Sequence, residues 1–247
     1  MMHPLLQLCA AGLMALACQS PAPAAPPVQA SSPSQASAPS AAPPDTPALE
    51  RQIIAQGLVE IRQVSPEVVV EMKYSTEDNF LRRDVYGEFD ACYLQPEAAR
   101  MLSRAQDALT AAHPKLRLIV FDCVRPRSVQ RIMWDLVKNT PQEPYVAPPG
   151  GGGSMHNYGC AVDLGLIHLD TGLVDMGTPF DYFGELAHPA LESRFLASGE
   201  LSRAQASNRA ILRSCMRSAG FQGIPHEWWH FIAFSREEVI RRYRIVE

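Results

Sequence analysis

Residues 154–167 of the chain read SMHNYGCAVDLGLI, which joins a polar turn to an apolar strand. Cys160–Ile167 is apolar at nearly every position and predicts a strand, while Asn157–Gly159 has the residue types of a turn. His156 lies just before this turn and Asp163 lies within the strand. A turn followed by a strand can return two side chains seven positions apart to one place, so the stretch predicts a sheet that carries both groups together.

The chain from residue 51 onward mixes helical and strand patterns without a regular βαβ alternation. The strongly apolar Leu116–Cys123 predicts a second strand, and apolar residues at helical spacing predict a helix over Gln95–Ala112. This mixture favours an α+β domain whose sheet is mostly antiparallel and is flanked by helices. The other predicted strands and helices are Val68–Tyr74, His230–Phe234, Ser128–Lys138, Ser202–Ser218 and Arg236–Arg244.

The first 50 residues contain no Lys or Arg, so all 22 basic residues lie from Arg51 onward. Pro4–Ala17 (PLLQLCAAGLMALA) is apolar but shorter than the ~20 residues of a membrane-spanning helix, which indicates an export signal over residues 1–17. It ends in Ala-Leu-Ala followed by Cys18, which resembles a bacterial lipobox. We therefore expect lipidation at Cys18; an ordinary cleaved signal with an incidental cysteine is the alternative.

Pro, Ala and Ser make up 24 of the 30 residues between positions 19 and 48. Such a segment has almost nothing to bury and is typical of an extended spacer. The sequence thus predicts a lipid-anchored linker over residues 18–50 and one folded domain over residues 51–247, which is long enough for a proper core. We expect an exported, periplasmic protein whose contact with the membrane is through its N-terminal lipid alone.

Charge and cysteine spacing exclude two kinds of site. The formal net charge of −4 gives no basic footprint for a nucleic-acid partner. The domain contains Cys92, Cys123, Cys160 and Cys215 without any CxxC spacing, which argues against a cysteine zinc site. An exported protein can form disulfides, and these four cysteines allow three pairings between which the sequence does not choose; buried free thiols are the alternative.

A second polar cluster, His226–Phe231 (HEWWHF), contains a literal HExxH string. In metallopeptidases of that kind the two histidines lie one helical turn apart. Gly223 and Pro225 precede the cluster and the strand pattern of Phe231–Phe234 follows it, so the local sequence disfavours a helix. We therefore expect His226 not to be a metal ligand.

The better interpretation combines the two clusters. His156, Asp163 and His230 would give a zinc ion three protein ligands and leave a fourth position open for water, as a catalytic site requires. Glu227, three residues before His230, would then be the base that acts on this water. Each residue alone has an ordinary structural explanation, but two such clusters in one domain favour a metal site.

The residues of both clusters resemble a known family. SMHNYGCAVD fits the SxHxxGxAxD pattern of the zinc D,D-peptidases, and EWWHF fits the second motif of the VanX-type D-alanyl-D-alanine dipeptidases. VVVEMKYSTEDNF, ACYL, FDCVRP and DMGTPFDYF are similar as well, so the resemblance runs from about Val68 to Phe234. It implies a hedgehog/D,D-peptidase-like fold, one zinc ion on the three ligands above, and Glu227 as general base.

The resemblance also implies roles for three further residues. Arg125, in the DCVRP stretch, matches the family arginine that stabilises the transition state, and Asp122 is expected to orient it. Asp181 is expected to bind the free amine of the substrate. The chain departs from the family at Val124, where a tyrosine is common, and at the additional His226.

The expected function is hydrolysis of the D-Ala-D-Ala dipeptide to free D-Ala, in turnover of peptidoglycan dipeptides. Two alternatives stay open. A D,D-carboxypeptidase that trims peptidoglycan stem peptides would use the same fold and differ in how it recognises the amine. A binding module without activity would be expected to lose the base, whereas Glu227 is present.

Overall fold

The computed structural model describes residues 47–247. The expected signal peptide at residues 1–17, the lipidation at Cys18 and most of the linker expected at residues 18–50 lie outside this part of the chain. Helix α1 (Ala48–Ala55) begins three residues before the expected start of the domain. Ile53 of this helix is fully buried, and the Tyr93 hydroxyl donates a hydrogen bond to Glu50.

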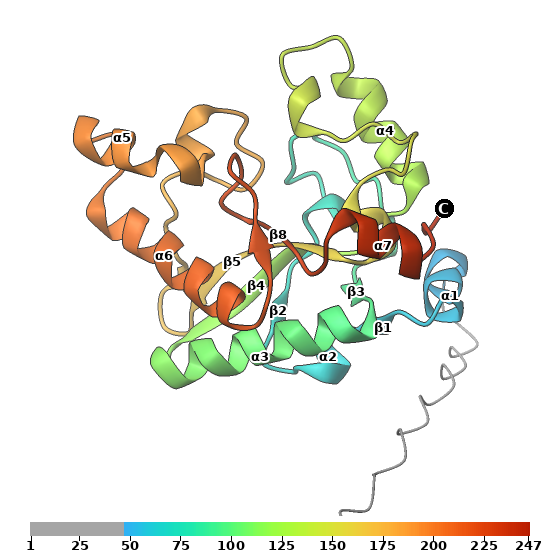
Figure 1. The fold of residues 1–247 in the computed structure, drawn as a ribbon, viewed down its shortest axis with the longest axis horizontal. Helices are drawn as coiled ribbons and strands as arrows, with labels where there is room; N and C mark the ends of the chain where they lie inside the picture. The colour runs from blue at the N-terminus through green and yellow to red at the C-terminus, as the bar shows by residue number, and fades with distance from the viewer. Residues whose placement is uncertain (1–46) are drawn as a thin grey trace, which may run out of the picture. The chain divides into compact units, whose positions relative to one another are not determined.

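A sheet in the order β2-β4-β5-β8-β7 forms the centre of the molecule (Figure 1). Only the β2–β4 pairing is parallel; β4–β5, β5–β8 and β7–β8 are antiparallel, and β6 adds to β5. This confirms the α+β class with a mostly antiparallel sheet. Its strands are β2 (Val69–Val70), β4 (Leu116–Asp122), β5 (Ala161–His168), β6 (Gly172–Leu173), β7 (Gln222–Gly223) and β8 (His230–Ile232); a separate pair is formed by β1 (Val59–Glu60) and β3 (Tyr93–Leu94).

Helix α3 runs along β4 and packs against α6 (Figure 1). Helix α6 begins as the sequence predicts, with a reciprocal capping box between Ser202 and Gln205. Of the helices in residues 47–247, none is long and apolar enough to cross a bilayer. The α-helices that follow α1 are α2 (Ile61–Val64), α3 (Pro96–Ala112), α4 (Arg127–Val137), α5 (Glu192–Ser198), α6 (Arg203–Ser218) and α7 (Arg236–Arg242).

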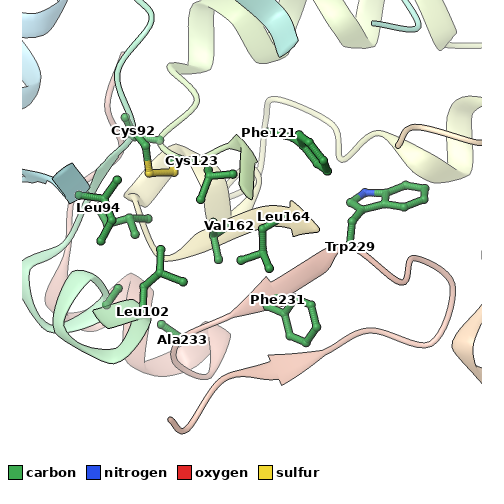
Figure 2. Packing of buried hydrophobic residues seen from close by; sticks show 14 of the residues in the cluster. Cys92, Leu94, Leu102, Phe121, Cys123, Val162, Leu164, Trp229, Phe231 and Ala233 are labelled. Atoms are coloured by element: carbon green, nitrogen blue, oxygen red, sulfur yellow. A yellow bond between two sulfur atoms is a disulfide. The ribbon is translucent and has the colours of Figure 1, made fainter. Parts of the chain in front are cut away.

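Part of the core lies between the central strands and α3, and further buried side chains such as Phe121 cover the other side of the strands (Figure 2). Val162 and Leu164 of β5, Phe231 of β8 and Leu102 of α3 are all buried. Strands β4 and β5 are covered on both faces, which is why they are apolar at almost every position instead of alternating. Charged residues within these two strands therefore stand out as candidates for function.

The predicted strand at Val68–Tyr74 is only partly present. Val69 and Val70 pair with β4, but the chain then forms a short 3₁₀ turn, η1 (Lys73–Ser75). This turn buries the Tyr74 ring and brings its hydroxyl to Asp181. The tertiary contact therefore ends the strand earlier than its β-branched sequence suggests.

The structure selects one of the possible cysteine pairings. Cys92 and Cys123 form a disulfide with their Cα atoms 5.2 Å apart, while Cys160 and Cys215 are free and buried. Burial raises the pKa of each of these two thiols to about 12. Both thiols are therefore protonated and unreactive at neutral pH.

We expect iodoacetamide at pH 8 to leave native protein spanning residues 47–247 unmodified, because neither free thiol is accessible or ionised. In denaturant without reductant the intact mass should show two modified cysteines, and with reductant four. Modification of the native protein, or four modified cysteines before reduction, would contradict this arrangement.

Candidate metal centre and active site

His156 is held by a tight turn ahead of β5. The turn is the 3₁₀ segment η3 (Met155–Tyr158), which starts at a capping box between Ser154 and Asn157. It ends at Gly159, whose φ of +65° is a left-handed conformation that glycine adopts without strain. The turn thus fixes the direction of the His156 side chain and returns the chain directly into the strand.

The register of the sheet places the other two candidate ligands. Asp163 of β5 lies opposite His230 of β8. The Nδ1 atom of His230 is 2.8 Å from Oδ1 of Asp163, and Nε2 of His156 is 3.3 Å from Oδ2. One potential ligand atom from each residue lies within 4.8 Å of the other two. The structure therefore brings together the three residues that the sequence predicts as ligands.

The chemistry of this donor set fits a metal ion. The Nδ1 atom of His156 donates a hydrogen bond of 2.7 Å to the carbonyl oxygen of Cys123, so in the neutral ring Nε2, the nitrogen nearer Asp163, has the lone pair that a metal ion needs. His156 and Asp163 are almost completely buried. Burial alone would raise the pKa of Asp163, but the neighbouring His156 and His230 hold it well below its usual range. Two imidazoles and one carboxylate are the ligands of many catalytic metal sites with an open position.

Glu227 lies next to the three candidate ligands and is not part of their cluster. Its Oε2 atom is 3.9 Å from Nδ1 of His230. Burial raises the pKa of Glu227 to about 7, which suits a group that accepts and returns a proton. The segment that contains it is not helical, so the HExxH string does not have the geometry of a helical metal motif.

Arg125 is fixed beside the metal site by buried partners. Asp122 accepts hydrogen bonds from its Nε at 2.8 Å and its Nη2 at 2.6 Å, and Gln130 accepts one from Nη1. The guanidinium lies over the Tyr74 ring, and Nη2 is 3.7 Å from Oδ2 of Asp163. Asp122 itself is fully buried and does not line the cavity, which fits the expected role of orienting Arg125.

Asp181 reaches the same cavity from a loop after β6. Its Oδ2 atom accepts a hydrogen bond of 2.9 Å from the Tyr74 hydroxyl, which burial keeps protonated by raising the tyrosine pKa. Burial also raises the pKa of Asp181, to about 8. Tyr74 was not singled out by its sequence, because it lies within a stretch that reads as a strand.

One cavity of about 400 Å³ joins the candidate ligands to the charged groups around them. The three candidate ligands, Glu227, Arg125 and Asp181 line it, and aromatic rings such as Trp229 form part of its wall. His226 also lines the cavity but is not part of the ligand cluster. A cluster of this kind, with an adjacent carboxylate and a fixed guanidinium, defines a metal-dependent hydrolase site.

Comparison with known proteins identifies the kind of hydrolase. A family model described as D-ala-D-ala dipeptidase, peptidase family M15, matches residues 54–244. The D-alanyl-D-alanine dipeptidase of Escherichia coli strain K12 is 32% identical, over 70% of this chain and 83% of that protein. The enzymes of Enterococcus faecium and Enterococcus faecalis strain V583 are 35% and 32% identical, over 66% and 65% of this chain and 84% and 83% of their own lengths. This chain belongs to family M15 and is a metallopeptidase.

The geometry predicts that His230→Ala loses the metal whereas His226→Ala retains it. His230 lies 2.8 Å from Asp163 in the ligand cluster, while His226 lines the cavity outside it. Metal content per chain after gel filtration, measured by mass spectrometry, checks the expectation. Loss of the metal from His226→Ala would restore the HExxH interpretation.

The raised pKa of Asp181 lets us predict how the stability of the metal-free protein depends on pH. Its pKa is about 8 when folded against an ordinary value of 3.8, so between about pH 4 and pH 8 the folded state binds a proton that the unfolded state has lost. The free energy of unfolding therefore falls as pH rises through this window. Asp181→Asn, which cannot ionise, should melt at a higher temperature than the wild type.

This gain should grow from pH 5 to pH 8, and thermal melting of the chelator-treated protein at both values measures it. Asp170→Asn serves as control because it changes an exposed carboxylate, paired with Lys115, outside the cavity. A gain for Asp181→Asn that is equal at the two pH values would contradict the assignment.

Proposed function

We propose that the chain is a zinc-dependent dipeptidase that hydrolyses D-Ala-D-Ala to free D-Ala. The observation that carries the proposal is the placement of Asp181 in the same cavity as the ligand cluster, Glu227 and Arg125. A dipeptidase needs a partner for the free amine of its substrate beside the hydrolytic groups. The names of the three relatives above support the choice of substrate.

His156, Asp163 and His230 would hold the zinc ion. When bound, zinc supplies Lewis-acid polarisation of the scissile carbonyl and makes a water molecule acidic enough to lose a proton near neutral pH. Glu227 accepts that proton and returns it to the leaving amine, for which a carboxyl with a pKa of about 7 is well matched.

Arg125 stabilises the negative charge that develops on the carbonyl oxygen. Its hydrogen bonds to Asp122 and Gln130 hold the guanidinium in place before substrate arrives, so little reorganisation is needed as the charge forms. Asp181 binds the ammonium group of the substrate, whose positive charge favours the ionised form of Asp181, and the Tyr74 hydroxyl orients this carboxylate. The buried setting makes this charge pair strong and also penalises its absence.

The proposal also places the enzyme outside the cytoplasm, tethered through Cys18. The apolar segment and lipobox-like residues at the start of the chain support export, and the Pro/Ala/Ser-rich residues 19–48 suit a spacer. The Cys92–Cys123 disulfide adds support, because such bonds persist in oxidising compartments. In that location the enzyme would recycle wall-derived dipeptide.

Release of D-Ala from three substrates tests the function. We expect rapid cleavage of D-Ala-D-Ala, and at least about 10²-fold lower kcat/KM for N-acetyl-D-Ala-D-Ala, which lacks the charge that Asp181 recognises. A pentapeptide stem should be similarly poor. Chelation should abolish activity and added zinc should restore it. Equal rates on the acetylated dipeptide or the pentapeptide would favour a carboxypeptidase and reject the role of Asp181.

The same assay tests the base. Glu227→Gln should keep its metal, because Glu227 is not a ligand, while kcat falls by about 10²–10⁴-fold. Glu237→Gln, at an exposed glutamate of α7, is the matched control and should behave as wild type. An active Glu227→Gln variant would show that another group moves the proton.

A further inference from the structure

Arg236 is a cavity-lining residue that the mechanism above does not use. It is the first residue of α7, and its side chain forms part of the wall of the cavity that holds the ligand cluster. Its Nη1 atom donates a hydrogen bond of 3.0 Å to the carbonyl oxygen of Gly153. No carboxylate of residues 47–247 forms an ion pair with it, in contrast to Arg242 of the same helix, which pairs with two.

The guanidinium of Arg236 lies against a loop that contains Gly152 and Gly153. A Cβ atom on Gly152 would lie 3.1 Å from Nη2 of Arg236, and the φ of +105° at this position also favours glycine. Gly153 accepts the hydrogen bond and is followed by Ser154, which begins the turn that holds His156. The guanidinium is thus fixed against the loop that leads, three residues later, into a metal ligand.

Of the two arginines that line this cavity, Arg236 keeps more of its five N–H donors free. The second one, Arg125, uses Nε and Nη2 on Asp122 and Nη1 on Gln130. Arg236 is exposed and uses one donor on a neutral carbonyl, so its positive charge has water but no carboxylate of residues 47–247 as its partner. An arginine with free parallel donors is well suited to a carboxylate.

We propose that Arg236 binds the C-terminal carboxylate of the substrate. The inference rests on the proposed function, in which a zwitterionic peptide places its ammonium group on Asp181 and its scissile bond at the ligand cluster. The remaining charge of such a substrate is its carboxylate, and Arg236 supplies the complementary charge in the same cavity. Arg236 would therefore help this chain to select the free acid over the corresponding peptide amide.

A pair of substrates that differ only in this charge tests the proposal. The kcat/KM of Arg236→Gln for D-Ala-D-Ala should fall about 10- to 100-fold, mainly through KM, as expected for a lost hydrogen-bonded charge pair that holds a remote part of the substrate. Its kcat/KM for D-Ala-D-Ala amide should stay at the low value of the wild type. Arg236→Lys should be intermediate for the free acid, because it keeps the charge but not the planar donors.

Arg241→Gln is the matched control, since it removes an exposed arginine of the same helix that does not line the cavity. It should leave both substrates unchanged. If Arg236→Gln lowers both substrates by the same factor, Arg236 only supports the glycine loop and the inference is wrong, while the proposed function stands. If the wild type cleaves D-Ala-D-Ala and its amide equally fast, the inference is likewise wrong and the proposed function stands. A zinc-loaded wild type that cleaves neither substrate would instead reject the proposed function, and this inference with it.

Discussion

The carboxylate of Asp163 is buried in the middle of the sheet, and the arrangement of the site depends on balancing its charge. A carboxylate removed from water is strongly unfavourable unless charged or hydrogen-bonding partners surround it. Here two imidazoles, from His156 and His230, and the guanidinium of Arg125 do so. Since the register places Asp163 between Asp122 and His230, a slip of one residue would turn it to the opposite face and leave these partners without it.

One short segment at the end of β4 supplies three different supports for this arrangement. The Asp122 side chain aims Arg125, and the Cys123 carbonyl sets the tautomer of His156. The backbone N–H of Arg125 donates to the carbonyl of His156, which ties the two loops together. The disulfide from Cys92 to Cys123 anchors the same segment to the residue that precedes β3. A residue of this segment can therefore affect metal binding or catalysis without touching substrate.

The regular elements of the fold could be predicted where a long pattern of apolar residues exists. Leu116–Cys123 and Cys160–Ile167 correspond closely to β4 and β5, and the capping box of Ser202 marks the start of α6. Two-residue strands such as β7 and short helices such as α2 carry no such pattern, because tertiary contacts create them. In the predicted strand Val68–Tyr74 the local pattern is overridden by a tertiary contact. Its β-branched residues favour a strand, but the chain turns at Tyr74, whose hydroxyl donates a hydrogen bond to Asp181.

The sequence by itself determined the candidate groups for the chemistry: the candidate ligands and the candidate base lie in two compact motifs whose local turn and strand patterns already point to a shared site. It did not determine what surrounds them. Tyr74, which orients Asp181, and Arg236, whose charge is left without an acidic partner, come from segments far apart along the chain and look like ordinary strand and helix residues there. Only the tertiary structure decides their roles, because burial, free donors and distance to a cavity depend on how remote segments pack.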